Sequence, residues 1–143
     1  MNRETEIRAL IDAQVRALRA KDVDSTLAAF SADVVRFDLA PPLRHVGAGD
    51  EARREFAAWF ATWQGAIGYE TRDFTVAAAG DLAFAHGYVR ISGTKSDGAR
   101  NALWARQTLC LRRGDGGWKI AHEHTSVPFL MDGSLRAAVD LQP

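Results

Sequence analysis

The sequence places one carboxylate where it could move protons. Asp38 follows Phe37 at the end of a predicted short strand, and Trp59 and Trp63 supply bulky aromatic side chains from a later segment. A carboxylate enclosed by such rings loses solvation, which raises its pKa toward the working range of a general base. The alternative is an aspartate at a strand end that caps the following turn. The residues themselves leave both interpretations open.

Polar side chains also alternate along the second half of the chain, so that every second one falls on the same face of a strand. Pairing Leu111 with Trp118 across the last turn places Arg106 opposite Glu123, whereas a slip of one residue would mix the two faces. Arg90, Arg106 and Glu123 fit an anionic or hydrogen-bonding ligand, or a cross-strand ion-pair network that stabilises the sheet. The candidate ligand-binding residues on this face are His86, Tyr88, Arg90, Trp104, Arg106, Thr108, Glu123 and Thr125.

Other polar positions have simpler interpretations beside the functional one. Gln14 interrupts the apolar stripe of a predicted helix, so its amide must contact either a ligand or another protein group. His122 and His124 have the spacing of some metal ligands, but no carboxylate nearby in sequence completes a set, and we expect no metal. Cys110 is the only cysteine, which excludes an intramolecular disulfide.

Composition excludes several classes of protein. A chain of 143 residues with 47% hydrophobic side chains fits one globular domain over residues 1–143. Its 18 basic and 18 acidic residues leave no positive excess for nucleic acid. No apolar stretch reaches the roughly 20 residues that span a membrane, and the charged start lacks a signal core. We therefore expect a cytoplasmic protein that uses no cofactor.

Helices come first along the chain, and strands follow. Apolar spacing predicts a helix around residues 7–18, a short one after Asp22, and a third capped by Asp50. A short strand is expected over 34–38. From Tyr69 the period changes to two, which predicts strands at about 69–79, 82–94, 100–112 and 117–127. This order indicates an α+β fold with helices on one face of an antiparallel sheet.

The closing segment RRGDGGWKIAHEHTSVP resembles the last hairpin of SnoaL-like proteins of the NTF2-like superfamily, and AKDVDSTLAAFSADVVRFD resembles that family's second helix and first strand. The resemblance implies a cone, in which a curved antiparallel sheet wraps around three N-terminal helices and encloses a pocket. It also implies a homodimer formed through the sheet. It says little about chemistry, because this fold carries many functions.

Two relatives within that superfamily suggest roles for single residues. Resemblance to ketosteroid isomerase makes Asp38 the base, although Gln14 stands at its tyrosine position and no acidic residue stands near Thr108. Resemblance to the association domain of calcium/calmodulin-dependent protein kinase II matches Arg90 to an arginine that binds carboxylates. The second resemblance implies that the face bearing Arg90 lines the pocket and that the other face meets a dimer partner.

The sequence thus predicts a pocket for a small, partly apolar molecule, with acid–base catalysis of isomerase, cyclase or hydrolase type. Asp38 is the expected base, and Arg90, Arg106 and Tyr88 are expected to orient the substrate. Gln14, Trp59 and Trp63 complete the expected lining. The alternative is a non-catalytic ligand-binding or oligomerisation module.

Overall fold

The three helices of residues 2–143 lie where the sequence predicts them, and one of the two predicted caps is confirmed. In the computed structural model, which describes residues 2–143, α1 (Arg3–Ala20) is capped by Asn2 and α2 (Val23–Ala28) by Asp22. The α3 helix (Asp50–Ala61) has Gly49 at its N-cap and no side-chain cap, so Asp50 is its first residue instead of its cap. None of these helices is long and apolar enough to cross a membrane.

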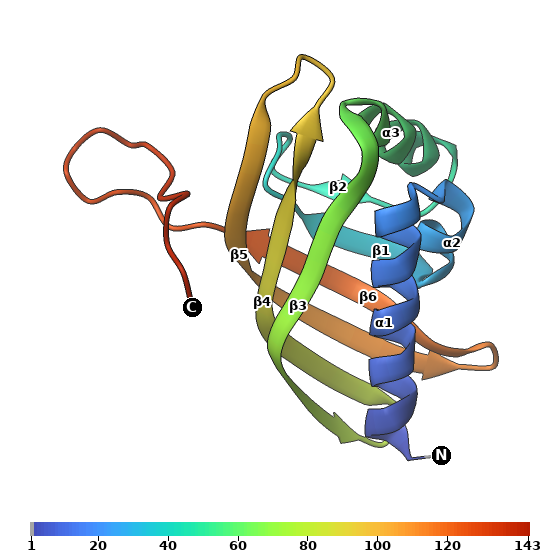
Figure 1. Cartoon of the computed structure of the whole chain (residues 1–143). Coiled ribbons are helices and arrows are strands. Elements are labelled where there is room, and N and C mark those ends of the chain that lie inside the picture. The colour runs from blue at the N-terminus through green and yellow to red at the C-terminus, as the bar shows by residue number, and fades with distance from the viewer. Residues whose placement is uncertain (1) are drawn as a thin grey trace.

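Six strands form one strongly curved sheet, shown in Figure 1. They are β1 (Phe30–Phe37), β2 (His45–Val46), β3 (Trp63–Ala79), β4 (Leu82–Lys95), β5 (Arg100–Gly114) and β6 (Gly117–Ser126). The spatial order is β2-β1-β6-β5-β4-β3. The predicted α+β class is confirmed, but the sheet is mixed, because β1 runs parallel to β6 while the other neighbours are antiparallel.

The core lies between α1 and the concave face of the sheet. Ile7 and Ile11 of α1 are buried, as are Val89, Leu109 and Ile120 of the strands. The ribbon in Figure 1 shows α1 running beside β3, with α2 and α3 near one end of the cone. Burying this apolar face is the main source of stability for the fold.

A β-bulge at Ala121 decides which β6 side chains face inward. Leu111 pairs with Ile120, and the next pair is Cys110 with His122, so Ala121 has no partner. A bulge of this kind inserts one residue and exchanges the faces beyond it. Glu123 therefore shares the concave face with Leu109 and sits opposite it. The expected pairing of Leu111 with Trp118 is wrong, and Arg106 lies opposite Ser126 instead of Glu123.

The concave face of β4 and β5 also differs from the expected one. Its buried side chains include Val89, Ala105, Gln107 and Leu109. The alternate positions face outward on the convex side, which corrects the predicted pocket lining for these two strands. The residues concerned are His86, Tyr88, Arg90, Trp104, Arg106 and Thr108. Small and aliphatic residues fit against α1, whereas long charged side chains there would be buried without partners.

Candidate functional site

A cavity of about 420 Å³ opens at the end of the cone, between α1, α3 and the concave face of the sheet. One part of its wall is aromatic, with Phe56, Trp59 and Trp63. The other part carries Asp38 just after β1, Glu55 of α3, Gln107 of β5 and Glu123 of β6. A concave, largely apolar pocket with a few polar groups is the usual form of a small-molecule site. Six of the predicted site residues line it, namely Gln14, Asp38, Trp59, Trp63, Glu123 and Thr125.

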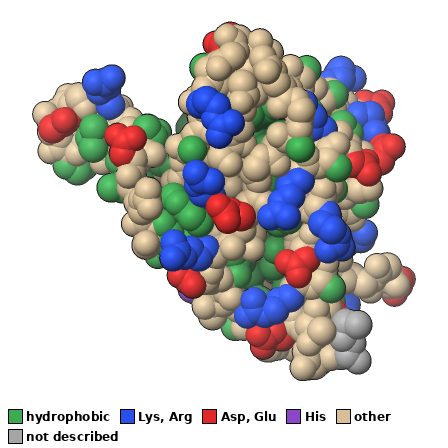
Figure 2. All heavy atoms as spheres, in the orientation of Figure 1, with side chains coloured by type: hydrophobic (Ala, Val, Ile, Leu, Met, Phe, Trp, Pro, Cys, Tyr) green, Lys and Arg blue, Asp and Glu red, His purple; other side chains and the backbone are tan. Residues whose placement is uncertain are grey.

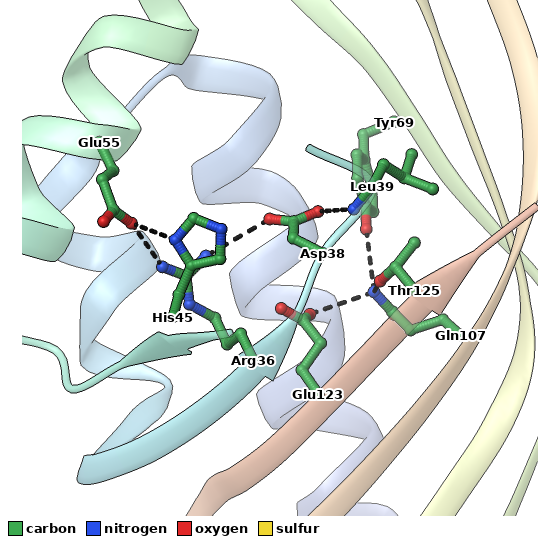
Figure 3. A network of polar contacts seen from close by, with 9 residues as sticks. All are labelled: Arg36, Asp38, Leu39, His45, Glu55, Tyr69, Gln107, Glu123 and Thr125. Carbon is green, nitrogen blue, oxygen red and sulfur yellow. Dashed lines mark hydrogen bonds and ion pairs between the residues drawn. The ribbon is translucent and has the colours of Figure 1, made fainter. Parts of the chain in front are cut away.

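Gln107 organises the inner polar wall, as Figure 3 shows. Its Nε2 donates to Oε1 of Glu123 at 3.1 Å and to Oγ1 of Thr125 at 3.1 Å. The hydroxyl oxygen of Tyr69 lies 3.4 Å from the same nitrogen. Gln107 was absent from the predicted site, although a glutamine between the buried Ala105 and Leu109 is the signal that could have indicated it.

Asp38 lies at the end of β1 beside this wall. Its Oδ1 accepts from the backbone N–H of Leu39 at 2.7 Å, and Nη1 of Arg36 lies 3.5 Å from its Oδ2. The side chain is 40% exposed, so Asp38 is open to the cavity and to water. The local bond to Leu39 fits the turn-capping interpretation, and the place in the cavity fits the catalytic one. Both features belong to the same carboxylate.

A buried arginine links Asp38 to a second carboxylate. Arg36 is only 3% exposed, and its Nη2 donates to Oε2 of Glu55 at 3.0 Å. Nδ1 of His45 contacts the same Glu55 oxygen at 2.9 Å. The guanidinium also lies 4.8 Å from the ring centre of Phe56, a favourable cation–π contact. Sequence reasoning missed Arg36, His45 and Glu55 because they come from three separate elements.

Glu123 has an unusual proton affinity. Its pKa is raised to about 7, mainly by burial and in addition by the charge of Asp38, while the charge of Arg36 partly opposes this shift. Desolvation also raises the pKa of Tyr69 well above its usual range, helped by the charge of Glu123. A carboxyl group that holds a proton near neutral pH can act as an acid, while a second carboxylate in the same pocket acts as a base.

The remaining predicted positions have structural contacts. Nε2 of Gln14 donates to the backbone carbonyl of Thr26 at 3.2 Å, so this amide both lines the cavity and ties α1 to α2. Nδ1 of His122 lies 2.7 Å from the carbonyl oxygen of Val35, and His124 is exposed on the convex side. Within residues 2–143, no group of three or more His, Cys, Asp or Glu side chains is arranged to hold a metal.

Comparison with known proteins places the fold. Among curated proteins, none matches the chain. An NTF2-like protein of unknown function from Pseudomonas putida KT2440 is 34% identical, covers 98% of this chain and 96% of its own, and superposes with a TM-score of 0.87.

Two more distant structures share the fold alone. A ketosteroid isomerase-like protein from Erwinia carotovora atroseptica is 24% identical, with 88% and 97% of the two chains covered and a TM-score of 0.73. A provisionally assigned calcium/calmodulin-dependent protein kinase II association domain from Xanthomonas campestris is 20% identical, with 88% of each chain covered and a TM-score of 0.75. The profile of the SnoaL-like domain matches residues 7–130. This chain therefore belongs to the SnoaL-like domain family, within the NTF2-like fold.

Proposed function

We propose that this protein catalyses acid–base chemistry on a small, partly apolar molecule bound in the cavity. The observation that carries the proposal is a pair of carboxyl groups in different surroundings within one pocket. Asp38 is open to solvent, whereas Glu123 is enclosed and has a pKa of about 7. Environments that separate the proton affinities of two such groups are how a site obtains an acid and a base at one pH.

Asp38 is the proposed base, as in the sequence prediction. It takes a proton from a carbon beside a carbonyl group or from a hydroxyl, while protonated Glu123 donates to the substrate oxygen that gains negative charge. In an isomerisation, Asp38 returns its proton to a different carbon and Glu123 recovers its own, so no proton is lost or gained. The same pair would serve a dehydration or cyclisation.

The residues that orient these groups differ from those expected. Arg90, Arg106 and Tyr88 lie on the convex side, so we assign the orienting roles to Gln107 and Arg36. Gln107 orients the Glu123 carboxyl group by a hydrogen bond to Oε1, and Arg36 orients Asp38 through the contact between its Nη1 and Oδ2 of Asp38. The ketosteroid isomerase-like protein shares its fold with this chain, and one fold can carry many reactions, so the proposal of proton transfer rests on the two carboxyl groups.

The test is a screen of small ketones, enones and hydroxy-ketones for exchange of protons with deuterated solvent, followed by two variants. We expect Asp38→Asn and Glu123→Gln each to lower the rate of exchange at least a hundredfold, in the range of a lost general acid or base. Glu70→Gln, which removes an exposed carboxylate from β3, is the matched control. Binding of the screened compounds without exchange would favour the non-catalytic binding module instead.

We propose a homodimer formed through the sheet, as predicted, but through the convex face, which was predicted to line the pocket. The convex side of the sheet exposes large apolar side chains, with Phe84 51% and Tyr88 37% exposed. Exposed patches of this kind commonly mark interfaces between protein chains. We propose that a second copy of the chain covers Phe84 and Tyr88, leaving the cavity of each subunit open on the opposite face.

A further inference from the structure

The polar end of the cavity carries an excess of carboxyl groups. Asp38, Glu55 and Glu123 all line it, and Arg36 is the cation beside them. The Arg36 guanidinium is already engaged, since Nη2 donates to Glu55 and Nη1 lies near Asp38. Its Nε is buried from solvent and has no hydrogen-bond partner among the described residues. An anionic ligand at this end would therefore meet like charges and no free cation.

The other cation of the described lining is Lys95 on β4, and it too is engaged. Its Nζ lies 3.8 Å from the ring centre of Trp63 and donates to Oγ1 of Thr62 at 2.9 Å. Partial desolvation lowers the pKa of Lys95, and the charge of Asp97 opposes this shift. One of its three N–H groups donates to Thr62 and the ammonium group faces the Trp63 ring, so a carboxylate here would share that group with two existing partners.

Another part of the cavity lining is aromatic. Trp59 and Trp63 meet edge to face with ring centres 6.0 Å apart, and Phe56 and Trp59 are only partly buried by the core. Phe56 and Trp59 line the cavity from α3. Flat aromatic surfaces of this kind bind planar apolar rings through stacking and edge contacts.

We infer that the cavity selects neutral molecules that combine a planar apolar ring with one carbonyl or amide group, and that it rejects the matching carboxylates. The inference rests on the proposed function, because the carbonyl oxygen is the group that would face the proton donor Glu123. A ring against Trp59 and Phe56 leaves its polar substituent toward Asp38 and Glu123. A carboxylate in that place would lose its hydration without gaining a cation.

This selectivity is opposite to that implied by the resemblance of Arg90 to a carboxylate-binding arginine. Arg90 lies on the convex side, where its Nη1 is 3.5 Å from Oε1 of Glu70. Arg90 therefore does not face the cavity, and its resemblance to a carboxylate-binding arginine does not predict which ligand the cavity binds. The carboxylates of β1, α3 and β6 set the charge there instead.

Benzamide and benzoate form the decisive probe pair, because they share shape and ring and differ in charge. Their binding can be followed at pH 7.5 by the shifts of backbone and indole N–H signals in a heteronuclear NMR titration. We expect benzamide to perturb signals of Trp59 and Trp63 and benzoate to bind at least tenfold more weakly, which is about 1.4 kcal/mol. Cyclohexanecarboxamide, which lacks the planar ring, should bind more weakly than benzamide.

Variants then test whether charge is the cause. Asp38→Asn should bring the benzoate affinity to within threefold of the benzamide affinity, and Glu123→Gln serves as the second variant should Asp38→Asn fold poorly. Glu70→Gln removes the same charge from the outer face and should leave the tenfold ratio unchanged. Tighter binding of benzoate than benzamide, or no perturbation of the cavity by either, would overturn the inference.

The two proposals fail in different ways. Loss of ligand selectivity with proton exchange intact would overturn only the inference about neutral ligands. Selective binding of benzamide, with no exchange of any screened compound, would leave the selectivity standing and overturn the catalytic proposal. The binding titration needs no turnover, so each result is read independently of the other.

Discussion

Gln107 donates from Nε2 to the carboxyl group of Glu123 at 3.1 Å, and this bond joins the centre of β5 to the end of β6. The same nitrogen also contacts Thr125 and the Tyr69 hydroxyl. One amide therefore holds three polar side chains on the inner wall of the cavity. Its position makes the polar wall a connected network, in which removing one member leaves others without partners.

Replacing Gln107 should destabilise the fold through that network. Gln107→Leu keeps most of the side-chain volume but leaves buried oxygens of Glu123, Thr125 and Tyr69 without a donor. We expect the free energy of unfolding in urea to fall by about 1–3 kcal/mol, the usual cost of unsatisfied buried polar groups. Gln64→Leu, at an exposed position of β3, is the control and should change stability by less than about 0.5 kcal/mol.

Glu123 should make stability depend on pH in a defined direction. Its pKa is about 7 in the folded protein, against 4.5 for an ordinary glutamate. Between these values the folded state binds more protons than the unfolded state, so stability falls as pH rises from about 4.5 to 7 and then levels off. The full effect has an upper limit on the order of 3 kcal/mol.

Chemical denaturation of the wild type and Glu123→Gln at pH 5, 6, 7 and 8 measures this dependence. The variant cannot ionise at this position, so the wild type should lose free energy of unfolding relative to the variant as pH rises. Parallel curves for the two proteins across the whole series would contradict the assignment of the raised pKa to Glu123.

Trp118 is predicted to be structural, and its surroundings agree. The side chain is 6% exposed, and its Nε1 donates to Oε2 of Glu6 on α1 at 3.0 Å. Trp118→Ala should lower the free energy of unfolding by about 3–5 kcal/mol, because it leaves a large void beneath α1. Trp104 is a less buried tryptophan on the convex side, so Trp104→Ala should lower the free energy of unfolding clearly less. Thermal denaturation of both variants measures the difference.

The proposed dimer predicts a mass of twice 15.7 kDa by light scattering in dilute buffer. Tyr88→Glu should reduce the mass toward that of one chain, because it places a charge in the middle of the apolar convex patch. Leu43→Glu alters an exposed residue of the segment between β1 and β2 and should leave the dimer intact. A wild-type mass near 15.7 kDa would refute a dimer formed through the sheet.

Local patterns in the sequence determined much of the fold. The apolar spacing of residues 7–18 predicts α1, Asp22 caps α2 as expected, and the change of period at Tyr69 lies within β3. Asp38 became a candidate through the resemblance of its segment ADVVRFD to the base-bearing segment of ketosteroid isomerase, and it directly follows β1. These features depend on contacts within a few residues, which a single sequence records directly.

Only the tertiary structure decided which face of each strand looks inward. A period of two offers two faces and does not label either of them, so the choice rests on register. Here the bulge at Ala121 brings Glu123 to the concave side while His122 and His124 turn outward. The cluster of Arg36, His45 and Glu55 likewise forms because β1, β2 and α3 meet at one end of the cone. These contacts form when segments that are distant in sequence pack together, and no local pattern in the sequence encodes them.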